Sequence, residues 1–161
     1  MKFGIIGLGR IGGNLSVQAM KKGHQVVGYS KSDEELNNLK IKGLVPADSV
    51  QSLVAELDSP RIVFLYIPHG NPVEDVCGEL KQCLEKGDIL IDGGNSHWKD
   101  SICRYEEFRK RGIYFLDCGT SGGVEGAISG ACFMIGGDEE AYSIAEPIFR
   151  DLAVPEGFMH V

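Results

Sequence analysis

Short apolar runs alternate with amphipathic segments along the 161 residues of this chain. The apolar runs are rich in Ile, Val, Phe and Leu, and they predict buried strands at Lys2–Ile6, Gln25–Tyr29, Arg61–Ile67, Asp88–Ile91, Ile113–Leu116 and Ala131–Ile135. The segments between and after them predict helices over residues 10–22, 33–41, 48–57, 72–86, 98–111 and 138–152, the last one kinked by Pro147. This alternation is typical of an α/β fold with a mostly parallel, doubly wound sheet and helices on both faces. Ligands of such a sheet bind beyond the carboxyl ends of its strands, so the loops after the strands are the candidate functional segments.

Composition narrows the class of protein further. The length suits one domain, and no linker or low-complexity tract divides the chain. The formal net charge of -7 argues against nucleic acid or an anionic membrane as a partner, and no apolar run approaches the roughly 20 residues that span a bilayer. The five cysteines include no C-x-x-C pair, which predicts reduced thiols in a cytoplasmic protein with neither a disulfide framework nor a metal site.

A glycine-rich loop follows the first predicted strand directly and opens the first predicted helix. It reads Gly7-Leu8-Gly9-Arg10-Ile11-Gly12, which is the pattern G-x-G-x-x-G. In this context the first glycine allows a tight turn, the second lets a pyrophosphate approach the backbone, and the third lets the helix pack closely on the strand. The N–H groups at the start of the helix would then bind the pyrophosphate. We therefore predict a Rossmann-type dinucleotide-binding domain over residues 1–161, the alternative being a glycine-rich turn without a ligand.

The end of the second predicted strand bears on the choice of cofactor. An Asp or Glu at this point would accept a hydrogen bond from the ribose 2′-hydroxyl of NAD and repel the 2′-phosphate of NADP. The chain has Ser30 and Lys31 here, and its next carboxylate is Asp33. A hydroxyl and a cation suit a phosphate, so the sequence favours NADP, with NAD as the alternative if Lys31 is an ordinary solvated lysine. Ser32 or Asp33 is the expected N-cap of the following helix.

Two later loops carry polar side chains among glycines. The loop after Ile91 reads Asp92-Gly93-Gly94-Asn95-Ser96, and the loop after Leu116 runs from Asp117 to Ala127 through Thr120-Ser121-Gly122-Gly123. Glycines let the backbone lie against a ligand, while the Asn95 amide and the Ser121 hydroxyl are hydrogen-bonding groups. Consecutive N–H groups after Ser121 are suited to an anion. We expect both loops to contact a substrate, although structural turns are the alternative.

With these loops in view, the chain resembles the decarboxylating 6-phosphogluconate dehydrogenases, within the wider β-hydroxyacid dehydrogenases. The likeness extends over the whole chain through GLGRIG, DGGNSHWKDS, GTSGGVEGA, CFMIGGDEEA and the strand-like terminal GFMHV. The combination of DGGNS with GTSGG is specific, because relatives that act on hydroxyisobutyrate or tartronate semialdehyde usually lack DGGNS. The spacing is most similar to that of the shorter-chain branch.

The resemblance implies an NADP-linked oxidation of 6-phosphogluconate at its 3-hydroxyl, followed by loss of CO₂ to give ribulose 5-phosphate, a step of the pentose phosphate pathway. It implies that Asn95 contacts both cofactor and substrate, and that Ser121, Gly122 and Gly123 bind the carboxylate end of the substrate. It also implies that Ile67 and Pro68 pack on the cofactor. The family commonly has a small residue where this chain has His69, which we expect to be a partly exposed loop residue.

The catalytic residues implied by the resemblance lie outside the motifs present. The family's lysine base and glutamate acid belong to a K-x-x-H-N-x-x-E helix of an all-helical C-terminal domain, and no K-x-x-H-N occurs in this chain. We therefore assign no catalytic residue here and expect a coenzyme-binding domain that is inactive alone, with an intact protein that forms a dimer or tetramer. The alternatives are another β-hydroxyacid dehydrogenase or reductase, or a non-catalytic dinucleotide-sensing module.

Overall fold

The computed structural model describes residues 1–161, which form eight strands and seven helices. The strands are β1 Lys2–Ile6, β2 Gln25–Tyr29, β3 Val45–Pro46, β4 Ile62–Leu65, β5 Ile89–Asp92, β6 Tyr114–Ser121, β7 Ala131–Gly136 and β8 Ala153–His160. The helices are α1 Arg10–Lys21, α2 Asp33–Lys40, α3 Val50–Ala55, α4 Asn71–Cys83, α5 Trp98–Arg109, α6 Gly123–Ser129 and α7 Glu139–Leu152. None of these helices has both the length and the apolar character needed to cross a bilayer.

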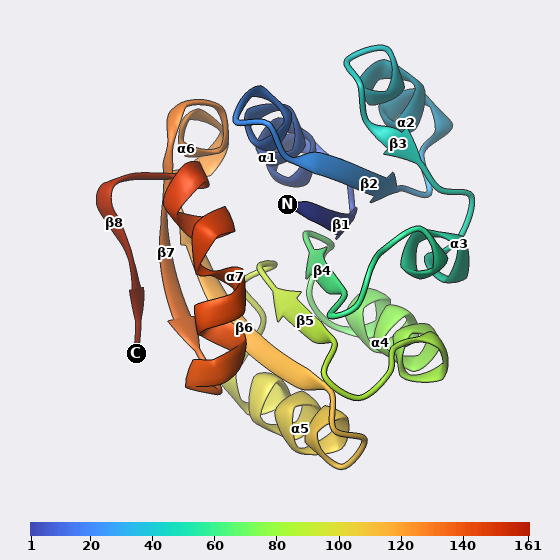
Figure 1. Cartoon of the computed structure of the whole chain (residues 1–161), viewed down its shortest axis with the longest axis vertical. Coiled ribbons are helices and arrows are strands. Elements are labelled where there is room, and N and C mark those ends of the chain that lie inside the picture. Colours follow the sequence, from blue (N-terminus) through green and yellow to red (C-terminus); the bar gives the residue numbers. More distant parts are fainter.

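All eight strands belong to one sheet, in the order β3-β2-β1-β4-β5-β6-β7-β8 (Figure 1). The chain builds outward from β1 to β3, then returns to pair β4 with the other side of β1 and continues outward to β8. The direction of winding therefore reverses between β1 and β4. Doubly wound sheets bind their ligands at this reversal, because the loops after the two strands leave toward opposite faces.

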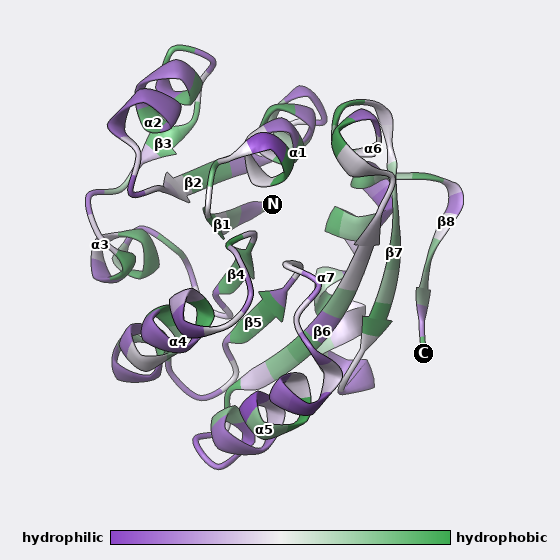
Figure 2. Cartoon of the chain, turned by 180° about the vertical axis from the view of Figure 1, so that it is seen from behind, coloured by the Kyte–Doolittle hydropathy of each residue, from purple (hydrophilic) through white to green (hydrophobic).

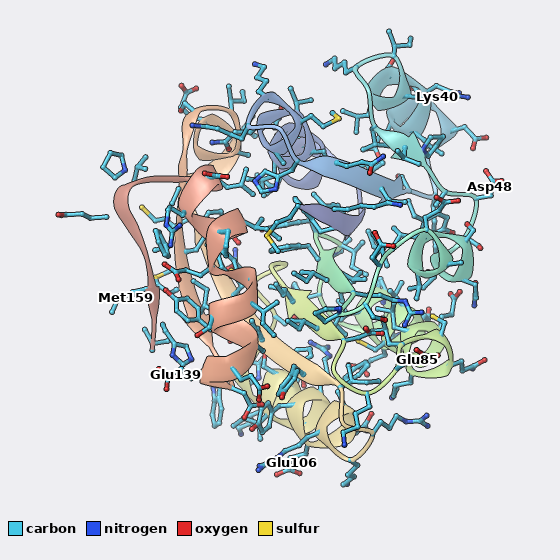
Figure 3. All side chains as sticks on the ribbon, viewed as in Figure 1. Lys40, Asp48, Glu85, Glu106, Glu139 and Met159 are labelled. Atoms are coloured by element: carbon cyan, nitrogen blue, oxygen red, sulfur yellow. The ribbon has the colours of Figure 1, made fainter.

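Helices cover both faces of the sheet, which explains why the strands are apolar on both sides. Helices α1, α6 and α7 contribute to a core of 23 buried residues, and α3, α4 and α5 contribute to a second core of 18. Successive residues of one strand alternate between the cores: Ile62 and Phe64 join the first, and Val63 and Leu65 the second. Figure 2 shows β4 and β5 in the green of hydrophobic residues. Charged residues such as Lys40 and Glu106 lie at the periphery (Figure 3).

The predicted α/β fold and mostly parallel sheet are confirmed, with one difference: the last two strands, β7 and β8, run opposite to the other six. Strands β1 and β2 have the predicted bounds, and Ser32 caps α2 by accepting a hydrogen bond from Glu35 N. Strand β7 pairs antiparallel with β6 and parallel with β8. Only residues 122–130 separate β6 from β7, whereas a parallel crossover needs a dozen or more residues.

The prediction that residues 117–127 form a loop was wrong in part. Strand β6 continues to Ser121, because residues 117–121 pair with residues 132–136 of β7, and the following residues form α6. The sequence pattern also did not predict β3, a two-residue strand at the edge of the sheet. These strands depend on pairing with a neighbouring strand, and the periodicity within one segment does not register such a pairing.

Candidate functional site

Two adjoining hollows lie between β1 and β4, where the direction of winding of the sheet reverses. The larger one, of about 460 Å³, is lined by the β1–α1 loop, the end of β2, the start of α2 and the segment after β4. The smaller one, of about 240 Å³, is lined by Ile11 of α1 and by residues after β4, after β5 and around the end of β6. Tyr66 and Ile67 line both hollows. A long ligand could therefore occupy the larger hollow and extend into the smaller one.

The glycine-rich loop makes a tight turn at the start of α1. Gly7 has φ +93, a left-handed conformation that favours glycine, and its N–H donates to Tyr29 O over 2.9 Å. A Cβ on Gly12 would lie 2.0 Å from Gly7 O, so α1 can approach β1 this closely only without a side chain there. Helix α1 has no side-chain cap and no acidic residue in its first turn. Its first N–H groups are therefore suited to an anion such as a diphosphate.

Two polar side chains meet beside the end of β2: the hydroxyl of Ser30, which follows the strand, and the carboxylate of Glu35, from the first turn of α2. Ser30 Oγ donates to Glu35 Oε2 over 2.7 Å and accepts a hydrogen bond from Ser32 N over 3.2 Å. Ser30, Lys31 and Glu35 all line the larger hollow, and Lys31 is exposed and makes no ion pair or side-chain hydrogen bond. Glu35 is not among the predicted residues, because it does not directly follow the strand and instead lies in the first turn of α2.

The loop after β5 is held by the buried carboxylate of Asp92. Its Oδ1 accepts a hydrogen bond from Gly94 N over 3.0 Å, and its Oδ2 accepts from Ser96 Oγ over 2.6 Å. Arg104 Nη1, on α5, donates to the same Oδ2 over 3.0 Å, and both members of this ion pair are buried. The loop therefore has a defined shape, in which Asn95 adopts φ 55.

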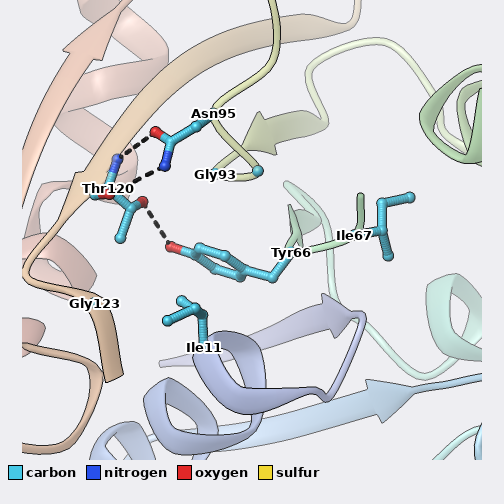
Figure 4. Close-up of a pocket in the computed structure, with 8 residues that line it drawn as sticks. Ile11, Tyr66, Ile67, Gly93, Asn95, Thr120 and Gly123 are labelled. Atoms are coloured by element: carbon cyan, nitrogen blue, oxygen red, sulfur yellow. Dashed lines mark hydrogen bonds between the residues drawn. The ribbon is translucent and has the colours of Figure 1, made fainter. Parts of the chain in front are cut away.

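Asn95 joins the loop after β5 to the end of β6. Its Nδ2 donates to Thr120 O over 3.2 Å, and Thr120 N donates to Asn95 Oδ1 over 3.1 Å (Figure 4). An amide of this kind has a second N–H and a second oxygen lone pair, which stay available to a ligand. Asn95 thus joins the loop after β5 to the end of β6, and it lines the smaller hollow.

Tyr66 lies in the wall between the two hollows. Its ring packs so closely on Gly93 that a Cβ at Gly93 would lie 2.6 Å from the ring. Its hydroxyl lies 3.4 Å from Thr120 Oγ1. Figure 4 draws this hydrogen bond. Burial raises the pKa of the Tyr66 phenol, so the hydroxyl stays protonated at neutral pH and can donate a hydrogen bond. Tyr66 is not among the predicted site residues, although its position directly after an apolar strand is a signal that could have indicated it.

The predicted site residues are distributed as follows. The larger hollow is lined by Gly7, Leu8, Gly9, Ser30, Lys31, Ile67 and Pro68, and the smaller one by Ile11, Ile67, Asn95 and Gly123. Four predicted residues line neither hollow: Arg10, Gly12, Ser121 and Gly122. Gly12 is buried under the turn, and the other three are exposed. His69 is exposed, as expected.

The chain matches a known protein family over nearly its whole length. Residues 2–159 match the family model described as the NAD binding domain of 6-phosphogluconate dehydrogenase. The chain belongs to this family. The chain is 46% identical over 160 residues, or 99% of its length, to YqeC of Bacillus subtilis (strain 168), a protein named provisionally as a 6-phosphogluconate dehydrogenase. It is 39% identical over 158 residues, or 96% of this chain, to the NAD(+)-dependent, decarboxylating 6-phosphogluconate dehydrogenase of the same organism.

A solved structure agrees with this assignment. The NAD-binding domain superposes on Plasmodium falciparum 6-phosphogluconate dehydrogenase, a structure described with its cofactor NADP+ and its substrate 6-phosphogluconate, with a TM-score of 0.91 and 31% identity. The superposition covers 100% of this chain and 37% of the Plasmodium chain. The chain spans about half the length of YqeC and about a third of the second Bacillus relative (54% and 34%).

Proposed function

We propose that this chain is the coenzyme-binding part, and one side of the substrate site, of a decarboxylating 6-phosphogluconate dehydrogenase. The observation that carries the proposal is the pair of adjoining hollows that share Tyr66 and Ile67. One is lined by the glycine-rich turn and the other by Asn95 of the DGGNS loop. A dinucleotide bound with its diphosphate at the turn would carry its nicotinamide toward the smaller hollow, where the oxidised substrate carbon would lie.

The residues present fit a nicotinamide dinucleotide, which accepts the hydride when it is bound. Gly9 leaves room for the diphosphate beside the start of α1, and Ile67 and Pro68 supply apolar surface. In the smaller hollow Asn95 offers hydrogen bonds to a substrate hydroxyl, and Gly123 stands at the start of α6. These residues would bind and orient the two reactants.

The smaller hollow supplies no group able to remove the proton of a hydroxyl. Its lining consists of Ile11, Tyr66, Ile67, Gly93, Gly94, Asn95, Thr120 and Gly123, without a Lys, His, Asp or Glu. Tyr66 stays protonated because its burial raises its pKa. We therefore propose that oxidation of 6-phosphogluconate to ribulose 5-phosphate and CO₂ needs an acid and a base from another part of the intact protein.

Two further proposals concern the location and the oligomeric state of the intact protein. We propose that it acts in the cytoplasm, since its five cysteines form no disulfide in this fold, and that it is a homo-oligomer. Analytical ultracentrifugation of the intact protein tests the second point, and a monomer would contradict it.

The proposed function is tested by binding and turnover measured on the same preparation of this chain. We expect NAD+ or NADP+ to bind, and the bound dinucleotide to raise the free energy of unfolding by about 2.7 kcal/mol at a concentration of 100 Kd. We expect no reduction of the dinucleotide when 6-phosphogluconate is added. If neither dinucleotide binds, the proposed function fails. Rapid formation of ribulose 5-phosphate by this chain would instead show that the missing acid and base are not required from elsewhere.

A further inference from the structure

The carboxylate of Glu35 lies between the end of β2 and the start of α1. Its Oε2 accepts the hydrogen bond from Ser30 Oγ at 2.7 Å, and its Oε1 is 3.6 Å from where a Cβ on Gly9 would stand. In a dinucleotide-binding fold the adenosine ribose lies between the glycine-rich turn and the end of the second strand. The carboxylate is therefore at the ribose end of the larger hollow, although it comes from α2 and not from β2.

The hydrogen bonds already present determine what this part of the hollow can offer a ligand. The only proton of the Ser30 hydroxyl is donated to Glu35, so Ser30 has no donor left for a phosphate. Glu35 Oε1 makes no hydrogen bond or ion pair within the chain, and it can accept a hydrogen bond from a ribose hydroxyl. The Ser30–Glu35 pair thus presents an acceptor where a 2′-phosphate would need donors.

The charge of the surrounding segment acts in the same direction. The first turn of α2 contains Asp33, Glu34 and Glu35, so the positive end of this helix dipole is already offset by carboxylates. Lys31 is the one cation among the residues that line this hollow, and it is exposed. A 2′-phosphate, with a charge of about -1.5 to -2, would be placed beside the Glu35 carboxylate.

We infer that Glu35, held by Ser30, makes this domain select NAD over NADP by accepting the ribose 2′-hydroxyl and repelling a 2′-phosphate. The inference rests on the proposed function, because it assumes that the larger hollow binds a nicotinamide dinucleotide. It departs from the NADP preference that Ser30 and Lys31 predict when the sequence is considered without the position of α2.

The test is isothermal titration calorimetry of NAD+ and NADP+ into the wild-type chain, Glu35→Gln and Glu34→Gln. Glutamine at position 35 keeps the size of the side chain and can still accept the bond from Ser30, but it carries no charge. Glu34→Gln is the matched control, because it removes the same charge from an exposed neighbour that does not line the hollow. Thermal unfolding monitored by circular dichroism verifies that each variant is folded.

We expect the wild type to bind NAD+ at least about tenfold more tightly than NADP+. Glu35→Gln should reduce this ratio by about tenfold, mainly through tighter binding of NADP+, whereas Glu34→Gln should change it by about twofold or less. Equal or tighter binding of NADP+ by the wild type would overturn the inference, as would equal effects of the two substitutions. Failure of both dinucleotides to bind would contradict the proposed function itself, and it is a different result from binding with the opposite preference.

Discussion

At the scale of single residues, two glycines determine how closely α1 approaches β1. Gly7 turns the chain with a positive φ, and Gly12 lies against the Gly7 carbonyl, where a Cβ would be 2.0 Å from the oxygen. The third glycine of the motif therefore acts through packing. Because Gly12 is buried and lines neither hollow, its contribution to ligand binding is to hold the turn in place.

This packing predicts that Gly12→Ala destabilises the protein. The new methyl group meets backbone, which cannot rotate away, so we expect a loss of about 1–3 kcal/mol in the free energy of unfolding, measured by urea denaturation, and weaker dinucleotide binding. Gly78→Ala is the control: Gly78 lies inside α4, and a Cβ there meets nothing within 4 Å. It should gain about 0.5–1 kcal/mol, because alanine favours the helix more than glycine does. Equal losses in both variants would contradict the packing argument.

At the scale of elements, a buried ion pair connects α5 to the end of β5 and to α4. Arg104 donates to Asp92 Oδ2, and its Nε and Nη2 donate to Glu74 Oε1 over 3.0 and 2.6 Å. Asp92 also holds the loop that carries Asn95. Three elements and the smaller hollow therefore depend on one guanidinium group.

Removal of that group should be costly. Arg104→Met leaves the Asp92 carboxylate buried without a cation, and we expect a loss of about 3–5 kcal/mol in the free energy of unfolding. Adding Asp92→Asn should recover part of the loss, since the unpaired charge is then absent. Arg150→Met is the control: its partner Glu146 is one turn away on α7 and the Arg150 side chain is 60% exposed, so about 0.5 kcal/mol or less is expected. A loss for Arg104→Met no larger than for Arg150→Met would contradict this account.

At the scale of the whole molecule, the two cores decide which cysteines can react. Cys77 lies in the core beneath α4 and Cys118 in the core on the opposite face, whereas Cys103 and Cys132 are exposed. Burial raises the pKa of the Cys77 and Cys118 thiols to about 12. At pH 8 roughly one in ten thousand of these thiols would be ionised, and the thiolate is the reactive form.

Labelling with iodoacetamide at pH 8, followed by peptide mass spectrometry, should modify Cys103 and Cys132 in the folded protein and leave Cys77 and Cys118 unmodified. The reactivity of the buried pair should rise with pH as the thiolate fraction grows, and unfolding in urea should expose all five cysteines. Modification of Cys118 at the rate of Cys132 in the folded protein would show that the core on that face is open.

The sequence alone was sufficient for the fold class, the bounds of β1 and β2, and the positions of Asn95 and Ile67 close to strand ends. These features depend on short-range patterns: strand periodicity, the spacing of glycines, and the rule that ligands bind at the carboxyl ends of parallel strands. Gly123, by contrast, begins α6, where the sequence predicted a loop. Tertiary structure decided what those residues touch. The Asn95 pairing with Thr120 depends on the register of β5 against β6, and the contact of Glu35 with Ser30 depends on where α2 returns toward β2. A local sequence pattern does not determine the direction of a side chain or the packing of distant segments. The position of the Glu35 carboxylate at the ribose end of the site could therefore be recognised only in the folded chain.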